Sequence, residues 1–137
     1  MDDAKIDTLV RLSDSDETVA DKASDIRGRH VVDKNNQPLG KIDALLLDEK
    51  EQKIRFFEVA SGGFLGLGAA KSLIPIDAIT KITEHEVHIN QSAEKVTKAP
   101  AYNPELINQP QFYERTYGHY GMVPFWGMNY IYPTHSK

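Results

Sequence analysis

The sequence contains no cysteine. This absence excludes disulfide bonds, catalytic thiolates and metal sites built from cysteine ligands. A chain without disulfides fits the reducing environment of the cytoplasm, and we therefore expect a cytoplasmic protein.

Long hydrophobic runs are also missing. No apolar stretch approaches the ~20 residues that a membrane-spanning helix requires. The first residues, Met1-Asp2-Asp3-Ala4-Lys5, are acidic and lack the apolar segment of a signal peptide. We therefore expect no membrane span.

The chain has no excess of positive charge. Its 137 residues include 16 Lys and Arg against 20 Asp and Glu, which gives a formal net charge of -4. Nonspecific nucleic-acid binding needs a basic surface, so this balance argues against nucleic acid as a partner. The length and the 40% hydrophobic content suit one domain with a modest core and a tail.

Residues 1–24 have few apolar side chains and many Asp, Glu, Ser and Thr. Such a composition cannot bury enough apolar surface to order itself, and it predicts a weakly ordered acidic leader. Within this leader, Leu9-Val10-Arg11-Leu12 can dock as a short edge strand.

Short strand patterns, separated by turn residues, fill most of residues 25–100. They lie at residues 30–33, 39–48, 54–60, 71–76, 80–83 and 86–90. This spacing is typical of small antiparallel barrels and sandwiches. We predict an all-β domain over residues 25–100, a small six-stranded antiparallel barrel with a short helix whose N-cap is Ser92.

Two of these strands have distinctive patterns. Residues 39–48 alternate incompletely, which indicates an irregularity around Asp43 and Ala44. Residues 54–60 form the strongest strand pattern. Regular alternation there predicts two opposite faces: Arg55, Phe57 and Val59 on one, and Ile54, Phe56 and Glu58 on the other.

The glycine-rich stretch at residues 61–70 resembles a phosphate-binding loop only in part. Gly63 and Gly68 have the required spacing, but Ala69 and Ala70 separate Gly68 from Lys71. A strand pattern follows in place of the helix that such a loop needs, so we expect no bound nucleotide or other cofactor. The apolar residues of the stretch either plug the barrel or pack on the helix, or they form a contact surface for a partner or a second copy. They are Phe64, Leu65 and Leu67.

The segment Glu84-His85-Glu86-Val87-His88 resembles a zinc motif superficially. Its histidines are three residues apart in a strand pattern, so they point to opposite faces, whereas the zinc-protease motif needs a helix. We therefore expect no metal. No nucleophile with a base, no paired acids and no cofactor loop are visible, and we expect a protein that is not an enzyme.

Residues 101–137 form an aromatic C-terminal extension. Its rings either pack on the barrel or on a partner subunit, or they form a recognition element, because Tyr and Trp are enriched at interface hot spots. The same side chains can stack on single-stranded RNA, but the extension lacks a basic groove. The candidate interaction residues here are Tyr113, Tyr117, Tyr120, Phe125 and Trp126.

Several motifs, taken in their order along the chain, resemble the PRC-barrel domain. This domain is named after the H subunit of the bacterial photosynthetic reaction centre. They are Asp25-Ile26-Arg27-Gly28, Val31-Val32-Asp33, Leu39-Gly40-Lys41-Ile42, the stretch from Val59 through Gly62-Gly63-Phe64-Leu65-Gly66-Leu67-Gly68, and Ile74-Pro75-Ile76-Asp77-Ala78-Ile79. The resemblance covers about residues 25–100. The extension is similar to one carried by a stand-alone bacterial branch of this family.

The resemblance implies a six-stranded barrel that acts as an adaptor. Family members include the reaction-centre subunit and a ribosome-maturation factor, but residues 1–24 hold neither the transmembrane helix of the first nor the separate domain of the second. We therefore expect a protein-interaction module. We expect it to work as a homodimer, because a core this small gains from oligomerisation. The alternatives are a factor associated with the ribosome or RNA processing, and an accessory protein of a photosynthetic complex.

Overall fold

The computed structural model describes residues 9–13, 25–60, 71–100, 102 and 110–133. Its strands are β1 (Leu9–Ser13), β2 (His30–Val32), β3 (Pro38–Asp48), β4 (Lys53–Ala60), β5 (Lys71–Pro75), β6 (Ile79–Ile82) and β7 (Glu86–Ile89). The 3-10 turn η3 (Ile76–Ala78) and the helices α2 (Ala93–Thr97) and α3 (Pro110–Tyr120) complete these elements.

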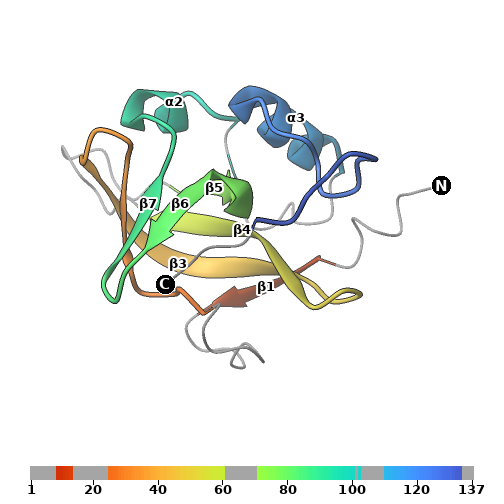
Figure 1. The fold of residues 1–137 in the computed structure, drawn as a ribbon, viewed down its shortest axis with the longest axis horizontal. Helices are drawn as coiled ribbons and strands as arrows, with labels where there is room; N and C mark the ends of the chain where they lie inside the picture. The colour runs from red at the N-terminus through yellow and green to blue at the C-terminus, as the bar shows by residue number, and fades with distance from the viewer. Residues whose placement is uncertain (1–8, 14–24, 61–70, 101, 103–109, 134–137) are drawn as a thin grey trace.

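All seven strands belong to one sheet, and both helices lie on the same side of it (Figure 1). The main path runs in the order β5-β4-β3-β2-β7-β6, and β1 pairs with β3 off this path. The predicted all-β fold is therefore confirmed. Within the described ranges, the hydrogen-bonded path is open, with β5 and β6 at its two ends.

One strand pair departs from the predicted antiparallel arrangement. β2 and β7 run parallel, with Val31 opposite Val87. Parallel neighbours need a long crossover connection, and here β3 to β6 lie between the two strands in the sequence. Turn signals identify hairpins between consecutive strands, so they could not reveal this pairing.

β3 is the longest strand and joins the two parts of the sheet. Its first residues pair with β2, its last five pair with β1, and β4 runs along its other edge. β4 pairs with β3 from Lys41 to Asp48, so β1 and β2 share the opposite edge of β3, where they follow one another. The edge strand predicted near Leu9 and Leu12 is β1.

Two bulges interrupt the pairing of β3 with β4. On β3, Ile42 pairs with Val59 and Ala44 with Glu58, which leaves Asp43 as the extra residue, as predicted. On β4, Arg55 is the extra residue, because Phe56 pairs with Leu46 and Ile54 with Leu47.

The bulge at Arg55 makes the predicted alternation of β4 wrong. Ile54 packs in the same hydrophobic cluster as Phe57 and Val59, although regular alternation places Ile54 on the opposite face. Phe56 packs in a second cluster on the other face. An inserted residue shifts the alternation of every residue before it, which a pattern of side chains alone does not reveal.

These two clusters divide the hydrophobic interior. The barrel core lies within the curved sheet and consists of Ile26, Val31, Ile42, Leu45, Ile54, Phe57, Val59, Ile74, Ile76, Ala78, Ile79, Val87, Ile89, Val96 and Tyr120. The outer cluster lies between β1, β3, β4 and β5 on one side and the extension on the other. It consists of Leu9, Leu46, Phe56, Leu73, Phe112, Tyr113, Tyr117 and Phe125.

The two helices begin at residues suited to helix starts. The Ser92 hydroxyl accepts a hydrogen bond from the Lys95 amide at 3.1 Å, so Ser92 caps α2 as predicted. α3 begins at Pro110. Proline lacks an amide hydrogen and has a helical φ, so it is well suited to the first position of a helix.

Candidate protein-interaction site

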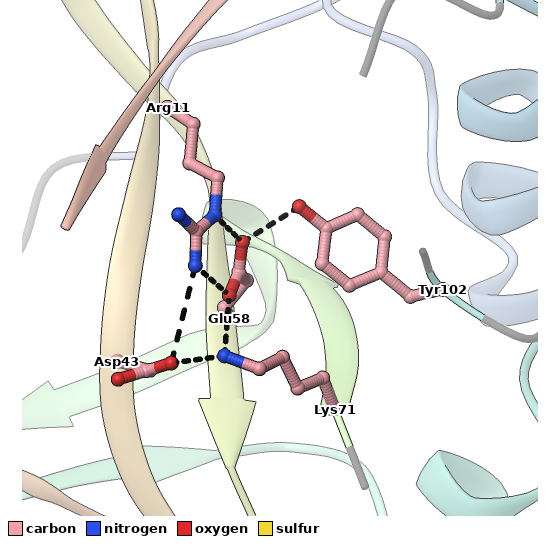
Figure 2. Close-up of polar contacts among 5 residues, drawn as sticks. All are labelled: Arg11, Asp43, Glu58, Lys71 and Tyr102. Atoms are coloured by element: carbon pink, nitrogen blue, oxygen red, sulfur yellow. Dashed lines mark hydrogen bonds and ion pairs between the residues drawn. The ribbon is translucent and has the colours of Figure 1, made fainter. Parts of the chain in front are cut away.

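A fully buried carboxylate, Glu58, joins three distant parts of the chain (Figure 2). Arg11 donates to both of its oxygens, through Nε to Oε2 and through Nη2 to Oε1 at 3.0 Å. The hydroxyl of Tyr102 donates to Oε2 at 2.7 Å. The Lys71 ammonium lies 3.6 Å from Oε1 and also pairs with Asp43. We call these five residues the Glu58 network.

Each member of the Glu58 network comes from a different segment. Arg11 lies on β1, Glu58 on β4 and Lys71 at the start of β5, directly after residues 61–70. Asp43 is the extra residue of the β3 bulge, and bulges redirect side chains. Tyr102 lies at the start of the extension. The network therefore ties the N-terminal strand and the extension to the same point of the sheet.

The network keeps Arg11 charged and Tyr102 neutral at neutral pH. The hydrogen bond to Glu58 raises the pKa of Arg11 further above its already high value. Burial, and then the hydrogen bond to Glu58, raise the pKa of Tyr102. Tyr102 thus stays a neutral donor, and Glu58 accepts from a cation and a phenol, which offsets the cost of burying its charge.

A second charged centre fastens the extension to β4. The Arg55 guanidinium is 3% exposed and pairs with Asp48 at 3.1 Å and with Glu51 at 3.0 Å. It also lies over the rings of Phe125, Tyr130 and Tyr132, with 4.5, 5.8 and 5.6 Å between the guanidinium carbon and the ring centroids. Such cation–π contacts strengthen when they are desolvated.

A backbone contact supports the same attachment. The Tyr132 hydroxyl donates to the carbonyl of Ile54 at 3.2 Å. Because this carbonyl precedes the extra residue of the β4 bulge, the bulge and the extension meet at one place. The tail is thus held on β4 by both charge and ring contacts.

Most predicted aromatic interaction residues lie inside the molecule. Tyr113 and Tyr117 have no exposed surface, and their ring centroids lie 5.2 and 5.0 Å from that of Phe56. Tyr120 is 5% exposed and Phe125 is 8% exposed. These four rings contact the chain's own sheet, and any use of them at an interface requires the extension to move.

Trp126 differs from the other rings because it is half-buried. It contacts Tyr117 and Phe125 edge-on, with centroids 5.7 and 5.0 Å apart. Phe64, Leu65 and Leu67 lie outside the described residues, so their role at an interface stays a prediction.

Sequence reasoning missed the aliphatic side chains of the extension. The exposed large hydrophobic residues in the described part of the chain are Val123, Met128 and Ile131, with exposures of 46%, 99% and 83%. We call them the exposed triad. They occur among aromatic residues in the sequence, and the contrast between buried rings and exposed aliphatic groups appears only once the tail is folded against β4.

The charged residues of β4 were also missed as a site. Arg55 and Glu58 interrupt an otherwise apolar strand pattern. A buried charge in such a strand needs a partner, so these two residues indicated ion pairs. They did not indicate Arg11 or Tyr102 as the partners of Glu58, because both are more than 40 residues away in the sequence.

The described ranges contain no group of three or more His, Asp or Glu that could hold a metal ion. His88 contacts Glu86, with 3.0 Å between Nε2 and Oε1. No helix within the described ranges is both long and apolar enough to cross a membrane.

Comparison with known proteins addresses the fold directly. The family model of the PRC-barrel domain matches residues 19–96, which is more than half of the chain. A search of curated proteins gave no match. The matched region contains β2 to β7, both bulges and most of α2. The open mixed sheet, with its short helix and this match, shows that the chain belongs to the PRC-barrel family.

Proposed function

We propose that this chain is a non-enzymatic adaptor that works as a homodimer and binds a partner protein through the exposed triad of its extension. PRC-barrel domains are protein-interaction modules, which supports the general role. The observation that carries the proposal is the exposure of Met128 and Ile131 on a segment otherwise packed against β4.

The exposed triad has the properties of a protein contact. Leaving apolar surface in water costs about 25 cal/mol per Å², so burying it against a partner is favourable. Methionine and aromatic residues are enriched at interfaces, and the half-buried rings of Trp126 and Tyr130 are close to the triad in the sequence. The contacts of Arg55 with Phe125 and Tyr130 order this segment in advance, which lowers the entropy lost on binding.

An adaptor needs a way to join two proteins. A homodimer presents two copies of the exposed triad and can therefore bind two partners, or one partner twice, with increased avidity. The net charge of -4 supports a protein partner over RNA.

Capture from the native host tests the partner surface. The tagged full-length chain is compared with a Met128→Ser/Ile131→Ser variant and with a matched control, Lys34→Ser, which changes an exposed residue in the turn between β2 and β3. We expect one or more proteins to be captured by the wild type and the control and lost from the double variant. All three chains should melt at similar temperatures, because both triad residues are exposed.

Two results contradict this proposal. Equal capture by the double variant removes the exposed triad from the interface. A salt-sensitive gel shift with ribosomal RNA, unchanged in the double variant, favours the RNA-associated alternative.

A further inference from the structure

Sulfur chemistry in this chain is confined to methionine. The sequence has no cysteine and three methionines, at positions 1, 122 and 128. An oxidant that acts on protein sulfur can therefore modify only a thioether, which it converts to a methionine sulfoxide. Met1 lies outside the described residues, so Met122 and Met128 are the two whose surroundings can be compared.

Met122 and Met128 differ strongly in exposure. Met122 is partly buried and packs against both the barrel core and the outer cluster, and its amide donates to the Tyr117 carbonyl at 2.9 Å. Met128 is 99% exposed. An oxidant in solution must reach the sulfur to react with it, so of these two residues Met128 is the one that reacts first.

Two tight turns fix Met128 at the surface. The Gly127 amide donates to the Pro124 carbonyl at 2.8 Å, and the Tyr130 amide donates to the Gly127 carbonyl at 3.3 Å. Met128 is therefore the second residue of a four-residue turn that a backbone hydrogen bond closes. A side chain at Gly127 would be crowded, because its Cβ would lie 3.0 Å from Cγ1 of Val123 and 3.1 Å from the Pro124 carbonyl oxygen. The local fold of the tail thus determines the exposure of Met128.

The segment that carries Met128 is held on both sides. Phe125 precedes it and Tyr130 follows it, and both rings lie over the Arg55 guanidinium. Oxidation adds one oxygen to a side chain that already lies in water, so the sulfoxide needs no new space. Such a change alters the exposed triad without lifting the tail from β4.

We propose that Met128 is a reversible oxidation site at which a peroxide controls the binding of the partner protein. This inference rests on the proposed function and adds a regulation of the same exposed triad. The thioether sulfur attacks one oxygen of hydrogen peroxide, so an S–O bond forms and the O–O bond breaks. The sulfur is oxidised by two electrons to a sulfoxide, and the second oxygen leaves with both protons as water.

The sulfoxide weakens the contact because it replaces an apolar surface with a polar one. Its oxygen accepts hydrogen bonds from water, and covering it with an apolar partner surface removes them. We expect the affinity to fall about tenfold, while Val123 and Ile131 keep their apolar surface. A methionine sulfoxide reductase reverses the change. With a dithiol as electron donor it restores the thioether, releases water and leaves a disulfide on the donor.

Peptide mass spectrometry tests the site itself without a partner. The folded full-length chain is treated with hydrogen peroxide, and sulfoxide formation at Met122 and Met128 is followed with time. We expect Met128 to react about tenfold faster than Met122 in the folded chain, and the two to react at equal rates once the chain is unfolded in urea. Equal rates in the folded chain overturn the proposal.

Capture from the native host tests the regulation. The tagged chain is compared untreated, after peroxide, and after peroxide followed by methionine sulfoxide reductases. The proteins that are scored are those that the wild type captures and the Met128→Ser/Ile131→Ser variant does not. We expect peroxide to release them and the reductases to restore them. Met122→Leu should respond to peroxide as the wild type does, whereas capture by Met128→Leu, at whatever level, should not change on treatment.

Failure of the regulation is distinguishable from failure of the interface. Capture that survives oxidation of Met128 but is lost in the Met128→Ser/Ile131→Ser variant overturns the regulation and leaves the exposed triad as the interface. Equal capture by the double variant overturns the interface itself. Peroxide sensitivity that persists in Met128→Leu assigns the effect to another residue and also overturns the regulation.

Discussion

At the scale of single residues, buried charges connect segments that are distant in the sequence. Glu58 is fully buried, and its oxygens accept from Arg11 on β1 and from Tyr102 in the extension. A buried ion pair adds little net stability compared with apolar packing, but it strongly penalises any arrangement that leaves the charge unpaired. Glu58 thus favours the one arrangement in which β1 and the extension are both docked.

Removing the two donors to Glu58 one at a time should show how much each contributes to the free energy of unfolding. Tyr102→Phe removes one hydrogen bond from a neutral donor to the carboxylate, and we expect the free energy of unfolding to fall by about 1.5 kcal/mol. Arg11→Ala removes a bidentate cation but leaves a site that water can enter, since Arg11 is 28% exposed, so we expect a loss of about 2 kcal/mol. Urea titration of each variant measures both values. An Arg11→Ala variant as stable as the wild type would show that Glu58 does not depend on β1.

Asp33 is a second buried carboxylate, and it gives a pH dependence. Its oxygens accept from the amides of Asn35 at 2.8 Å, Gln37 at 2.7 Å and Ala93 at 2.8 Å, which ties the turn after β2 to the start of α2. Burial acts to raise the pKa of Asp33, but these backbone donors outweigh burial and hold it below its ordinary value.

The direction of this pKa shift determines whether stability rises or falls with pH. A lowered pKa in the folded state means that Asp33 contributes stability above its unfolded pKa of ~3.9, and that this contribution is lost as the pH falls through the folded value. Asp33→Asn should therefore lose less stability than the wild type between about pH 5 and pH 3. Thermal unfolding of both chains across this range checks the prediction, and parallel curves would contradict it.

At the scale of elements, the extension is a helix and a tail fitted to one face of the sheet. In α3 the buried residues are Phe112, Tyr113, Thr116, Tyr117 and Tyr120. Their spacing of three and four residues forms one helical face, which packs on the outer cluster and reaches the barrel core through Tyr120. The exposed residues of this helix are Gln111, Glu114, Arg115 and Gly118.

Tyr120 separates the contribution of ring packing from that of the hydroxyl. Its side chain is 5% exposed, and its hydroxyl has no hydrogen-bond partner among the described residues. We expect Tyr120→Phe to match or exceed the wild type in stability, because it removes a buried polar group without a partner. Tyr120→Ala should cost about 3–5 kcal/mol through the cavity that it leaves. Chemical denaturation ranks the three chains, and a Tyr120→Phe variant that loses more than about 1 kcal/mol would reveal a hydrogen bond to this hydroxyl.

The sequence predicted most elements but not all of their relations. Short-range signals were sufficient for the Ser92 cap and for the bulge at Asp43, because neighbouring residues determine both. The bulge at Arg55 was missed because apolar residues lie on both sides of this one charged residue. Such a pattern does not show that a residue is inserted. The parallel pairing of Val31 with Val87 depends on chain topology, and the partners of Glu58 depend on the tertiary fold.

At the scale of the whole molecule, the barrel carries β1 along an edge of β3 and the extension on one face of the sheet. β1 comes from the N-terminal side and the extension from the C-terminal side, and they meet at Glu58 through Arg11 and Tyr102. The sequence identified the barrel and the aromatic extension. It did not identify the exposed triad, because the exposure of Met128 and Ile131 depends on how the tail folds against β4.

We propose that this PRC-barrel protein is a self-associating adaptor. Light scattering on the full-length chain over a range of concentrations tests it most directly. The account predicts a mass that reaches about twice the 15.4 kDa of one chain. A constant mass of one chain at every concentration would contradict it.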